Sequence, residues 1–406
     1  MSFTNRAALA LVGVLLAGSA CSGNGTVPAS PSGAGNSASQ PSNVDTNATL
    51  PTEDTNAALP AEDTPADSTS ILKKLKKDVV IGSTVDPTNG DKGPRALSLV
   101  KISYLDFKKG QLLVCNFENS AGKGGKGTTI DVLDPKPGSK PTTYARSSDI
   151  EGCDGDAITS ADDVYASGLT SGVVAGFTPA GKLITTHGSP IEKPFSVVDA
   201  SCTSTADSIG PAFCSYSAEY IFVSDAKTGS IVSFSINNYG NPKPTQVATG
   251  FAANNKTNWS RLGPSGLSYD GKKDMLYIAD GKSNTVVVFS HAGELLEKNE
   301  IVVQPGGKTF KCKYKKACGK LIYSGAPLNA PVAMTRLPNG NLIVANTKGG
   351  NTLVELTPAG QVLDTKVVDT SKTAGIFALQ ASGKTDSDTV LFYTDTNTNT
   401  LHELEQ

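Results

Sequence analysis

The stretch LYIADGKSNTVVVFSHAGELL, residues 276–296, contains the pattern that decides the fold. It consists of a short apolar strand that ends in Asp280, a polar turn, a β-branched strand, an Ala-Gly turn and the start of a third strand. Short strands separated by turn residues are typical of antiparallel sheets. The stretch therefore predicts a hairpin that continues into a further strand.

The same unit occurs six times along the chain. When the copies are aligned on the polar residue that ends the first strand, they follow one another at intervals of 51, 58, 55, 66 and 49 residues. One four-stranded blade of a β-propeller has about this length. Strands that open on or near a proline, at 193–199, 263–270 and 330–337, precede the units and are expected to line the centre. The aligned residues are Asn116, Ser167, Asp225, Asp280, Asn346 and Asp395.

These repeats predict an all-β fold: a six-bladed propeller of four-stranded antiparallel blades over residues 71–406. The last copy stops at about its third strand, at Gln406, whereas DVVIGSTV (78–85) has no unit of its own. If 78–85 is the outer strand of the last blade, N-terminal and C-terminal segments share one sheet, and the free edges of an open array disappear. We therefore expect the N-terminal strand to close the ring.

The repeat resembles the NHL-repeat family of six-bladed propellers. The resemblance covers about residues 78–406 and is strongest in 263–296; it is weak in the first two copies. It implies a binding platform, the common role in that family, but related six-bladed propellers include calcium-dependent lactonases, gluconolactonases and virginiamycin B lyases. Fold alone does not choose among these functions. The matching positions are Pro264, Gly266, Leu267, Tyr277, Ala279, Asp280, Asn284 and Val286.

The N-terminal 70 residues predict export and a tether. Residues 1–20 have one positive charge, Arg6, and about fourteen apolar or small residues, which is typical of a signal peptide. The sequence GSAC (18–21) resembles the bacterial lipobox, so Cys21 is the expected lipid anchor; a secreted protein with a free Cys21 is the alternative. Residues 21–70, rich in Ser, Pro, Asn and Thr, predict a disordered stalk. We expect a location at the cell envelope, with membrane contact only through the lipid.

The other six cysteines support export. An even number in an exported chain predicts three disulfides, and six cysteines allow fifteen pairings. Proximity in the sequence favours Cys312–Cys318 and Cys202–Cys214, which leaves Cys115–Cys153 to join neighbouring blades.

An enzyme is the alternative interpretation, as a metal-dependent lactonase or gluconolactonase-like hydrolase with its site in the central channel. One carboxylate among the six residues expected at the starts of the inner strands is a poor set for calcium, which takes six to eight oxygens. The three histidines (His187, His291 and His402) fall on outer strands or turns, and we expect His291 and His402 to be solvated. The six inner-strand residues are Arg95, Asp156, Ser196, Ser265, Val332 and Ile376.

The aspartates and asparagines that recur at the end of the second strand have two interpretations. They could form an acidic rim for a ligand, or each could accept hydrogen bonds from the backbone of the following turn. Because they recur at one place in the repeat, the structural interpretation is favoured.

The insertion between Gln304 and Ala326 is not explained by the repeat. As a connection from the outer strand of one blade to the inner strand of the next, it is expected on the top face of the ring, where all such connections lie. A rigid basic loop with aromatic side chains predicts contact with an anionic envelope polymer or an acidic envelope protein. A solubilising loop is the alternative. The proposed contact residues are Lys308, Phe310, Lys311, Lys313, Tyr314, Lys315, Lys316 and Lys320.

Taken together, the sequence predicts a non-catalytic binding or scaffold propeller at the bacterial cell envelope. With 36 basic and 38 acidic residues the chain lacks the positive charge that nucleic-acid binding requires, and no nucleic-acid partner is expected. No cofactor is expected; the hydrolase alternative would use calcium.

Overall fold

The structure, a computed structural model, describes residues 69–406 except 104, 106, 201–218, 238–240 and 255–262. Within these residues the chain forms strands β1–β26 and two short 3-10 helices, η1 (Ser148–Ile150) and η2 (Ala292–Glu294). No helix in this part of the chain is long and apolar enough to cross a membrane.

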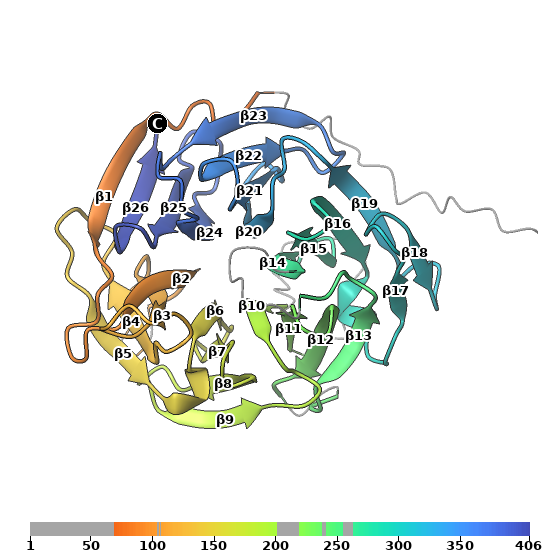
Figure 1. Ribbon diagram of the computed structural model, residues 1–406, viewed down its shortest axis with the longest axis horizontal. Coiled ribbons are helices and arrows are strands. Elements are labelled where there is room, and N and C mark those ends of the chain that lie inside the picture. Colours follow the sequence, from red (N-terminus) through yellow and green to blue (C-terminus); the bar gives the residue numbers. More distant parts are fainter. Residues whose placement is uncertain (1–68, 104, 106, 201–218, 238–240, 255–262) are drawn as a thin grey trace, which may run out of the picture. The chain divides into compact units, whose positions relative to one another are not determined.

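Six antiparallel sheets are arranged around a centre as the blades of a propeller (Figure 1). Blade one is β2 (Lys92–Leu99), β3 (Leu112–Glu118), β4 (Thr129–Leu133) and β5 (Thr142–Arg146). Blade two is β6 (Cys153–Ile158), β7 (Val164–Gly168), β8 (Val173–Phe177) and β9 (Leu183–His187). Blade three begins with β10 (Pro194–Asp199), β11 (Tyr220–Asp225), β12 (Ser230–Ser235) and β13 (Thr245–Thr249). The predicted fold is confirmed.

The second half of the ring follows the same order from the centre outward. Blade four is β14 (Pro264–Asp270), β15 (Met275–Asp280), β16 (Thr285–Ser290) and β19 (Gly319–Ser324). Blade five is β20 (Pro331–Arg336), β21 (Leu342–Asn346), β22 (Thr352–Leu356) and β23 (Val362–Val367). Blade six is β24 (Ile376–Ser382), β25 (Val390–Asp395), β26 (Thr400–Glu405) and β1 (Lys77–Ser83).

The N-terminal strand closes the ring, as predicted. β1 pairs antiparallel with β26 from Lys77 opposite Glu405 to Ser83 opposite Thr400 (Figure 1). The Tyr393 hydroxyl donates to Asp78 at 2.6 Å, and the His402 ring stacks on the Tyr393 ring with centroids 4.7 Å apart. The expectation that His402 is solvated was wrong, since its side chain is only 13% exposed and its Nδ1 lies 3.1 Å from both Asp78 Oδ1 of β1 and the Tyr393 hydroxyl of β25.

The core of the propeller lies between the blades. Six apolar clusters occur in the described residues, and each draws mainly on two adjacent blades. The cluster between blades four and five, for example, contains Tyr277 and Val286 from one blade and Met334 and Val354 from the other. Middle strands such as β11 and β16 are therefore buried on both faces, which explains their continuous apolar runs.

The recurrent acidic residues are structural, as favoured from the sequence. Asp280 accepts from the backbone amides of Lys282 and Ser283 at 2.9 and 3.1 Å. Asp225 also accepts from the amides of Lys227 and Thr228, each at 3.0 Å. Each carboxylate therefore holds the tight turn between the second and third strands of its blade.

Blade three differs from the predicted four strands. β17 (Ile301–Val303), which directly precedes the insertion, and β18 (Phe310–Cys312), which lies in it, form a hairpin that adds two strands to the outer edge of blade three, with β17 parallel to β13. The insertion then returns to blade four and ends with β19, the fourth strand of that blade, so the hairpin lies between the third and fourth strands of blade four in the sequence. The expected connection between two blades was wrong. Repeat spacing gives the length of an insertion but not the sheet that it joins.

Candidate functional site

A cavity of about 300 Å³ lies in the channel at the centre of the ring and is lined by all six inner strands, β2, β6, β10, β14, β20 and β24. Concave, partly polar sites of this size are where small molecules bind in proteins. The channel is therefore the first candidate site.

Every inner strand shifts register against its neighbour close to its start. A bulge bends the strand and re-aims the side chain that it carries. Of the six residues expected at the starts of the inner strands, Arg95, Asp156, Ser196 and Val332 are in the lining of the cavity, whereas Ser265 and Ile376 are not. In each inner strand, one residue directly follows the last cross-strand pair before the register shift. These residues are Arg95, Asp154, Phe195, Ser265, Val332 and Phe377.

Arg95 is held firmly at one end of the channel. Its guanidinium carbon lies 3.8 Å from the centre of the Phe117 ring and 3.9 Å from that of the Phe377 ring. Its Nη1 lies 3.6 Å from Oδ1 of Asp154. Only 9% of the Arg95 surface is exposed. This desolvated cation, placed between two aromatic faces, joins strands of blades one, two and six.

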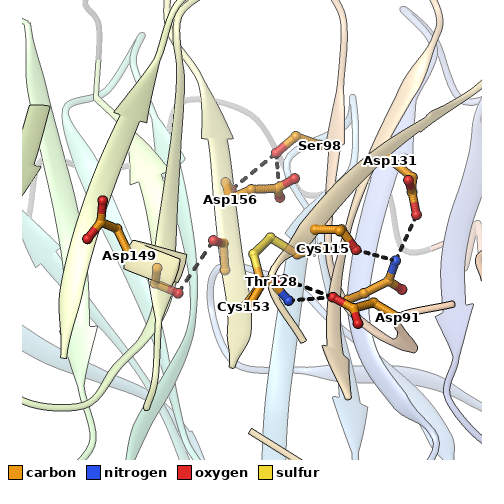
Figure 2. The surroundings of a disulfide bond; sticks show 12 residues. Asp91, Ser98, Cys115, Thr128, Asp131, Asp149, Cys153 and Asp156 are labelled. Atoms are coloured by element: carbon orange, nitrogen blue, oxygen red, sulfur yellow. Dashed lines mark hydrogen bonds between the residues drawn. A yellow bond between two sulfur atoms is a disulfide. The ribbon is translucent and has the colours of Figure 1, made fainter. Parts of the chain in front are cut away.

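Two carboxyl groups of β6 face Arg95 and its neighbours. Asp154 was missed in the sequence because the bulge, not simple alternation, directs it toward the channel. Burial raises the pKa of Asp154 to about 7, although Arg95 opposes the shift. Burial likewise raises the pKa of Asp156 to about 7, and the Ser98 hydroxyl donates to Asp156 Oδ1 at 2.8 Å (Figure 2). Both groups can therefore give or take a proton near neutral pH.

The channel does not fit the calcium that the resemblance to lactonases implies. Two of its three carboxyl groups, Asp154 and Asp156, come from β6, and the third, Asp199, comes from β10. The Arg95 guanidinium lies beside Asp154. A fixed positive charge at that distance opposes a divalent cation. Across the described residues, no group of three or more Asp, Glu, His or Cys is placed to hold a metal ion.

The lysine-rich insertion is the second candidate site, and the structure brings its residues together at the outer rim rather than at the channel (Figure 1). Lys311 is exposed in the edge strand β18, Lys313 and Lys315 are exposed just after it, and Lys308 is exposed in the turn before it. Tyr314 is 45% exposed, whereas the Phe310 ring packs against the Phe289 ring, centroids 6.1 Å apart. The hairpin is therefore anchored on its inner side and basic on its outer side.

Two of the six lysines are already paired. Lys313 forms an ion pair with Glu297, and Lys316 Nζ lies 2.6 Å from Glu294 Oε2. Lys313 also lies 5.1 Å from the centre of the Tyr314 ring. Within the described residues, no ion pair forms at Lys308, Lys311, Lys315 or Lys320, all of which are exposed.

Two of the predicted disulfides are present. Cys115 of β3 is bonded to Cys153 of β6, which joins blades one and two (Figure 2), and Cys312 is bonded to Cys318 within the insertion. Cys202, Cys214 and the proposed lipid anchor Cys21 lie outside the described residues.

No protein-family model matches the sequence, and no curated protein matches it. Solved structures similar to this one include a catalytically inactive virginiamycin B lyase from Staphylococcus aureus with quinupristin, at 13% identity and a TM-score of 0.45 over 81% of this chain and 87% of that one. A streptogramin B lyase shares 11% identity at a TM-score of 0.44, over 80% and 96% of the two chains. A nidogen/laminin complex shares 14% identity at 0.44, over 68% and 81%. None of these similarities carries an argument about function.

Proposed function

We propose that this protein is a binding propeller of the bacterial cell envelope, related to the NHL-repeat propellers. It is exported by residues 1–20, anchored through a lipid on Cys21 and carried by a stalk over residues 21–70. Its partner is an anionic polymer of the envelope, which contacts the insertion.

The observation that supports this proposal is the basic hairpin at the outer rim. A disulfide and the packing of Phe310 hold the hairpin before any partner arrives, so little conformational entropy is lost on binding. Lys308, Lys311 and Lys315 follow one extended strand and its turns, and they have no ion-pair partner among the described residues. A row of separated cations along a strand matches a linear polymer of negative charge better than a single anion.

The alternative interpretation, in which the insertion is a solubilising loop, depends on the same lysines. An exposed edge strand is protected against pairing with other chains when it carries lysine, and Lys311 occupies such a position. The two interpretations differ in what happens when the charges are removed: a binding surface loses its ligand, whereas a protected edge begins to associate.

Binding of the full chain to heparin, used as a model anionic polysaccharide, tests the proposal. Four substitutions, Lys308→Gln, Lys311→Gln, Lys315→Gln and Lys320→Gln, remove the unpaired charges. We expect about a tenfold or greater loss of affinity and a weaker dependence on salt, because each exposed ion pair contributes about 0.2–1 kcal/mol.

A matched control removes four other exposed lysines on blades one, two, five and six. Equal losses in the two variants would mean that net charge alone binds heparin, and the proposal would fail. Tight binding of poly-glutamate but not of heparin would point to an acidic protein as the partner. The control substitutions are Lys123→Gln, Lys182→Gln, Lys372→Gln and Lys384→Gln.

One observation favours a second candidate function, a hydrolase that uses the channel. Asp154 and Asp156 have pKa values raised to about 7 and line the same cavity as Arg95, which is the combination that acid–base chemistry requires. Lactone hydrolysis by the full chain that disappears in Asp156→Asn and peaks near neutral pH would support this candidate.

A further inference from the structure

A second cavity lies at the outer rim, away from the channel and from the lysine hairpin. It is found where blade one meets blade two, between β5 and the turn that leads into β9 (Figure 1), and it has a volume of about 590 Å³. Cavities of this size hold small molecules or the head of a larger one. The walls of this rim cavity come from residues of 107–111, the turn 134–140, residues 142–144 of β5 and the turn residues 179–180.

The inner wall of the rim cavity is apolar and held from both blades. Phe107 is 3% exposed, and its ring centroid lies 5.1 Å from that of Tyr144. The Tyr144 hydroxyl donates to the backbone carbonyl of Thr178, in the turn before β9. At Gly181 of the same turn, a Cβ atom would lie 2.1 Å from the Tyr144 carbonyl oxygen, so only glycine allows this close contact. The contacts between the two blades therefore fix the shape of the wall.

The outer part of the rim cavity is basic. Lys108, Lys136 and Lys140 line it and are exposed. The one carboxylate in the described lining belongs to Asp134, whose Oδ2 lies 3.1 Å from Nζ of Lys136. Among the ion pairs of the described residues, none involves Lys108 or Lys140. Asp163 acts electrostatically on the wall but does not line the cavity. Two ammonium groups are therefore available to an anionic ligand.

Exposed apolar side chains gather in the two segments beside the rim cavity. The described residues expose eight large apolar side chains, and four of these lie within five residues of a cavity wall in the sequence. The backbone amide of Lys109 donates to the Ser103 hydroxyl at 2.8 Å, which holds the first of these segments against residues 107–111. Exposed apolar groups that gather at one place mark contact with a partner or a membrane. The four side chains are Ile102, Leu105, Leu183 and Ile184.

Lysines and aliphatic side chains together favour a bilayer surface over a soluble polyanion. A polysaccharide would satisfy the lysines but would leave Ile102 and Leu183 in water. An anionic phospholipid satisfies both groups, because its phosphate meets the ammonium groups while the aliphatic side chains enter the boundary between headgroups and acyl chains. The lysine hairpin differs in this respect, since Tyr314 is the one large apolar side chain that residues 305–325 expose.

We propose that the rim cavity is a membrane contact that binds the headgroup of an anionic phospholipid. The phosphate lies among Lys108, Lys136 and Lys140, and Ile102 and Leu183 reach into the layer below the headgroups. The proposal uses the membrane location of the proposed function but not the ligand of the hairpin. It adds a protein surface to the membrane contact that the sequence assigns to the lipid on Cys21 alone.

Sedimentation with phospholipid vesicles tests the contact. The mature chain, from residue 21 onward and carrying Cys21→Ser, is used because the signal segment and the lipid would each bind a bilayer by themselves. We expect at least about tenfold tighter binding to vesicles of equal parts phosphatidylglycerol and phosphatidylcholine than to pure phosphatidylcholine. The binding should weaken as salt is added, because salt screens the lysines. Free glycerol phosphate at the same phosphate concentration should not release the protein.

Two paired variants separate the charged and the apolar parts of the contact. Lys108→Gln with Lys140→Gln removes the two unpaired charges and should weaken binding to the mixed vesicles by about tenfold or more. Ile102→Ser with Leu183→Ser keeps the charges and should weaken binding by about fivefold or more.

The matched control is Lys308→Gln with Lys311→Gln, which removes two charges from the hairpin and should bind the vesicles as the unaltered chain does. An equal or larger loss in this control would overturn the proposal, because net charge or the hairpin would then make the contact. Unchanged binding in Ile102→Ser with Leu183→Ser would also overturn it, as would release by glycerol phosphate or equal binding to both kinds of vesicle. Heparin binding by the hairpin is measured separately, so either proposal can fail without the other.

Discussion

Asp154 and Asp156 show how strongly the environment of a single residue changes its chemistry. Both are aspartates of one strand, and both are buried, so the pKa of each rises from 3.8 to about 7. The neutral form is favoured in the folded chain, whereas the unfolded chain ionises in the ordinary range. Protons are therefore taken up on folding between about pH 4 and about pH 7, and the free energy of unfolding falls as pH rises through that window.

Replacing Asp156 with asparagine should remove this dependence in part. At pH 7.5 the Asp156→Asn variant should be more stable than the unaltered chain by up to a few kcal/mol. The asparagine at position 156 neither takes up a proton nor buries a charge when the chain folds. The difference should shrink toward pH 4, where the folded and unfolded aspartate are both protonated. Urea unfolding at several pH values measures the change, and a difference that is the same at pH 4 and pH 7.5 would contradict it.

Glu355 is the residue on which the start of the propeller depends. It is fully buried, and it accepts from the Ser70 hydroxyl at 2.7 Å, from the backbone amides of Ile71 and Leu72 at 3.2 and 2.8 Å, and from Asn341 Nδ2 at 2.8 Å. One carboxylate therefore holds the segment that leads into β1 against blade five.

Removing that carboxylate should destabilise the propeller. Glu355→Ala leaves the buried amides of Ile71 and Leu72 without an acceptor, and we expect a loss of roughly 3 kcal/mol in the free energy of unfolding. Glu355→Gln keeps one acceptor oxygen and should lose less. Thermal unfolding of the three proteins gives the comparison, and equal stability of Glu355→Ala and the unaltered chain would show that the contact contributes nothing.

At the scale of elements, the blades are held to one another by apolar faces and by a few specific links. The apolar clusters between neighbouring blades are general, whereas the Cys115–Cys153 bond is a single link between blades one and two. The Cys312–Cys318 bond does not link two blades, because it closes only a short loop within the insertion.

The two disulfides should therefore contribute unequally to stability. Their cysteines are 38 and 6 residues apart in the sequence, and in the chain-entropy account a longer loop restricts the unfolded chain more, by about 4 and about 2 kcal/mol respectively. Cys115→Ala with Cys153→Ala should lower the melting temperature more than Cys312→Ala with Cys318→Ala. The reverse order, measured by calorimetry, would show that the insertion matters more to the fold than the link between the blades.

The whole molecule combines a closed ring with an N-terminal segment that enters it at β1. Closure places β1 beside β26, so the first and last strands of the chain share blade six (Figure 1). A protein held by a lipid at Cys21 would carry this ring at the end of the stalk.

The lipid anchor is testable on the whole chain. If Cys21 carries the proposed lipid, Cys21→Ser should move the protein from the membrane fraction to the soluble fraction, because the thiol that would receive the lipid is gone. Mass spectrometry of the mature N-terminus gives the complementary result, a lipid-modified Cys21 in the unaltered chain. An unmodified N-terminus downstream of an ordinary signal cleavage would favour the secreted form.

The sequence alone determined the repeat, and with it the number of blades, the closing strand and two disulfides. These features depend on local periodicity: each unit repeats the same strand, turn residue and strand, and Asp225 and Asp280 hold their turns through contacts only two or three residues away. Such short-range physics is visible in a single sequence.

Only the tertiary structure decided which residues meet. The bulge directs Asp154 to the channel by a displacement of one position in register. The addition of β17 and β18 to blade three, the hydrogen bonds of residues 70–72 to Glu355 and the hydrogen bond of Thr143 to Asp86 all join residues that are distant in the sequence. The sequence pattern is silent on these contacts because register and sheet partners are set by packing between blades, which no local period encodes.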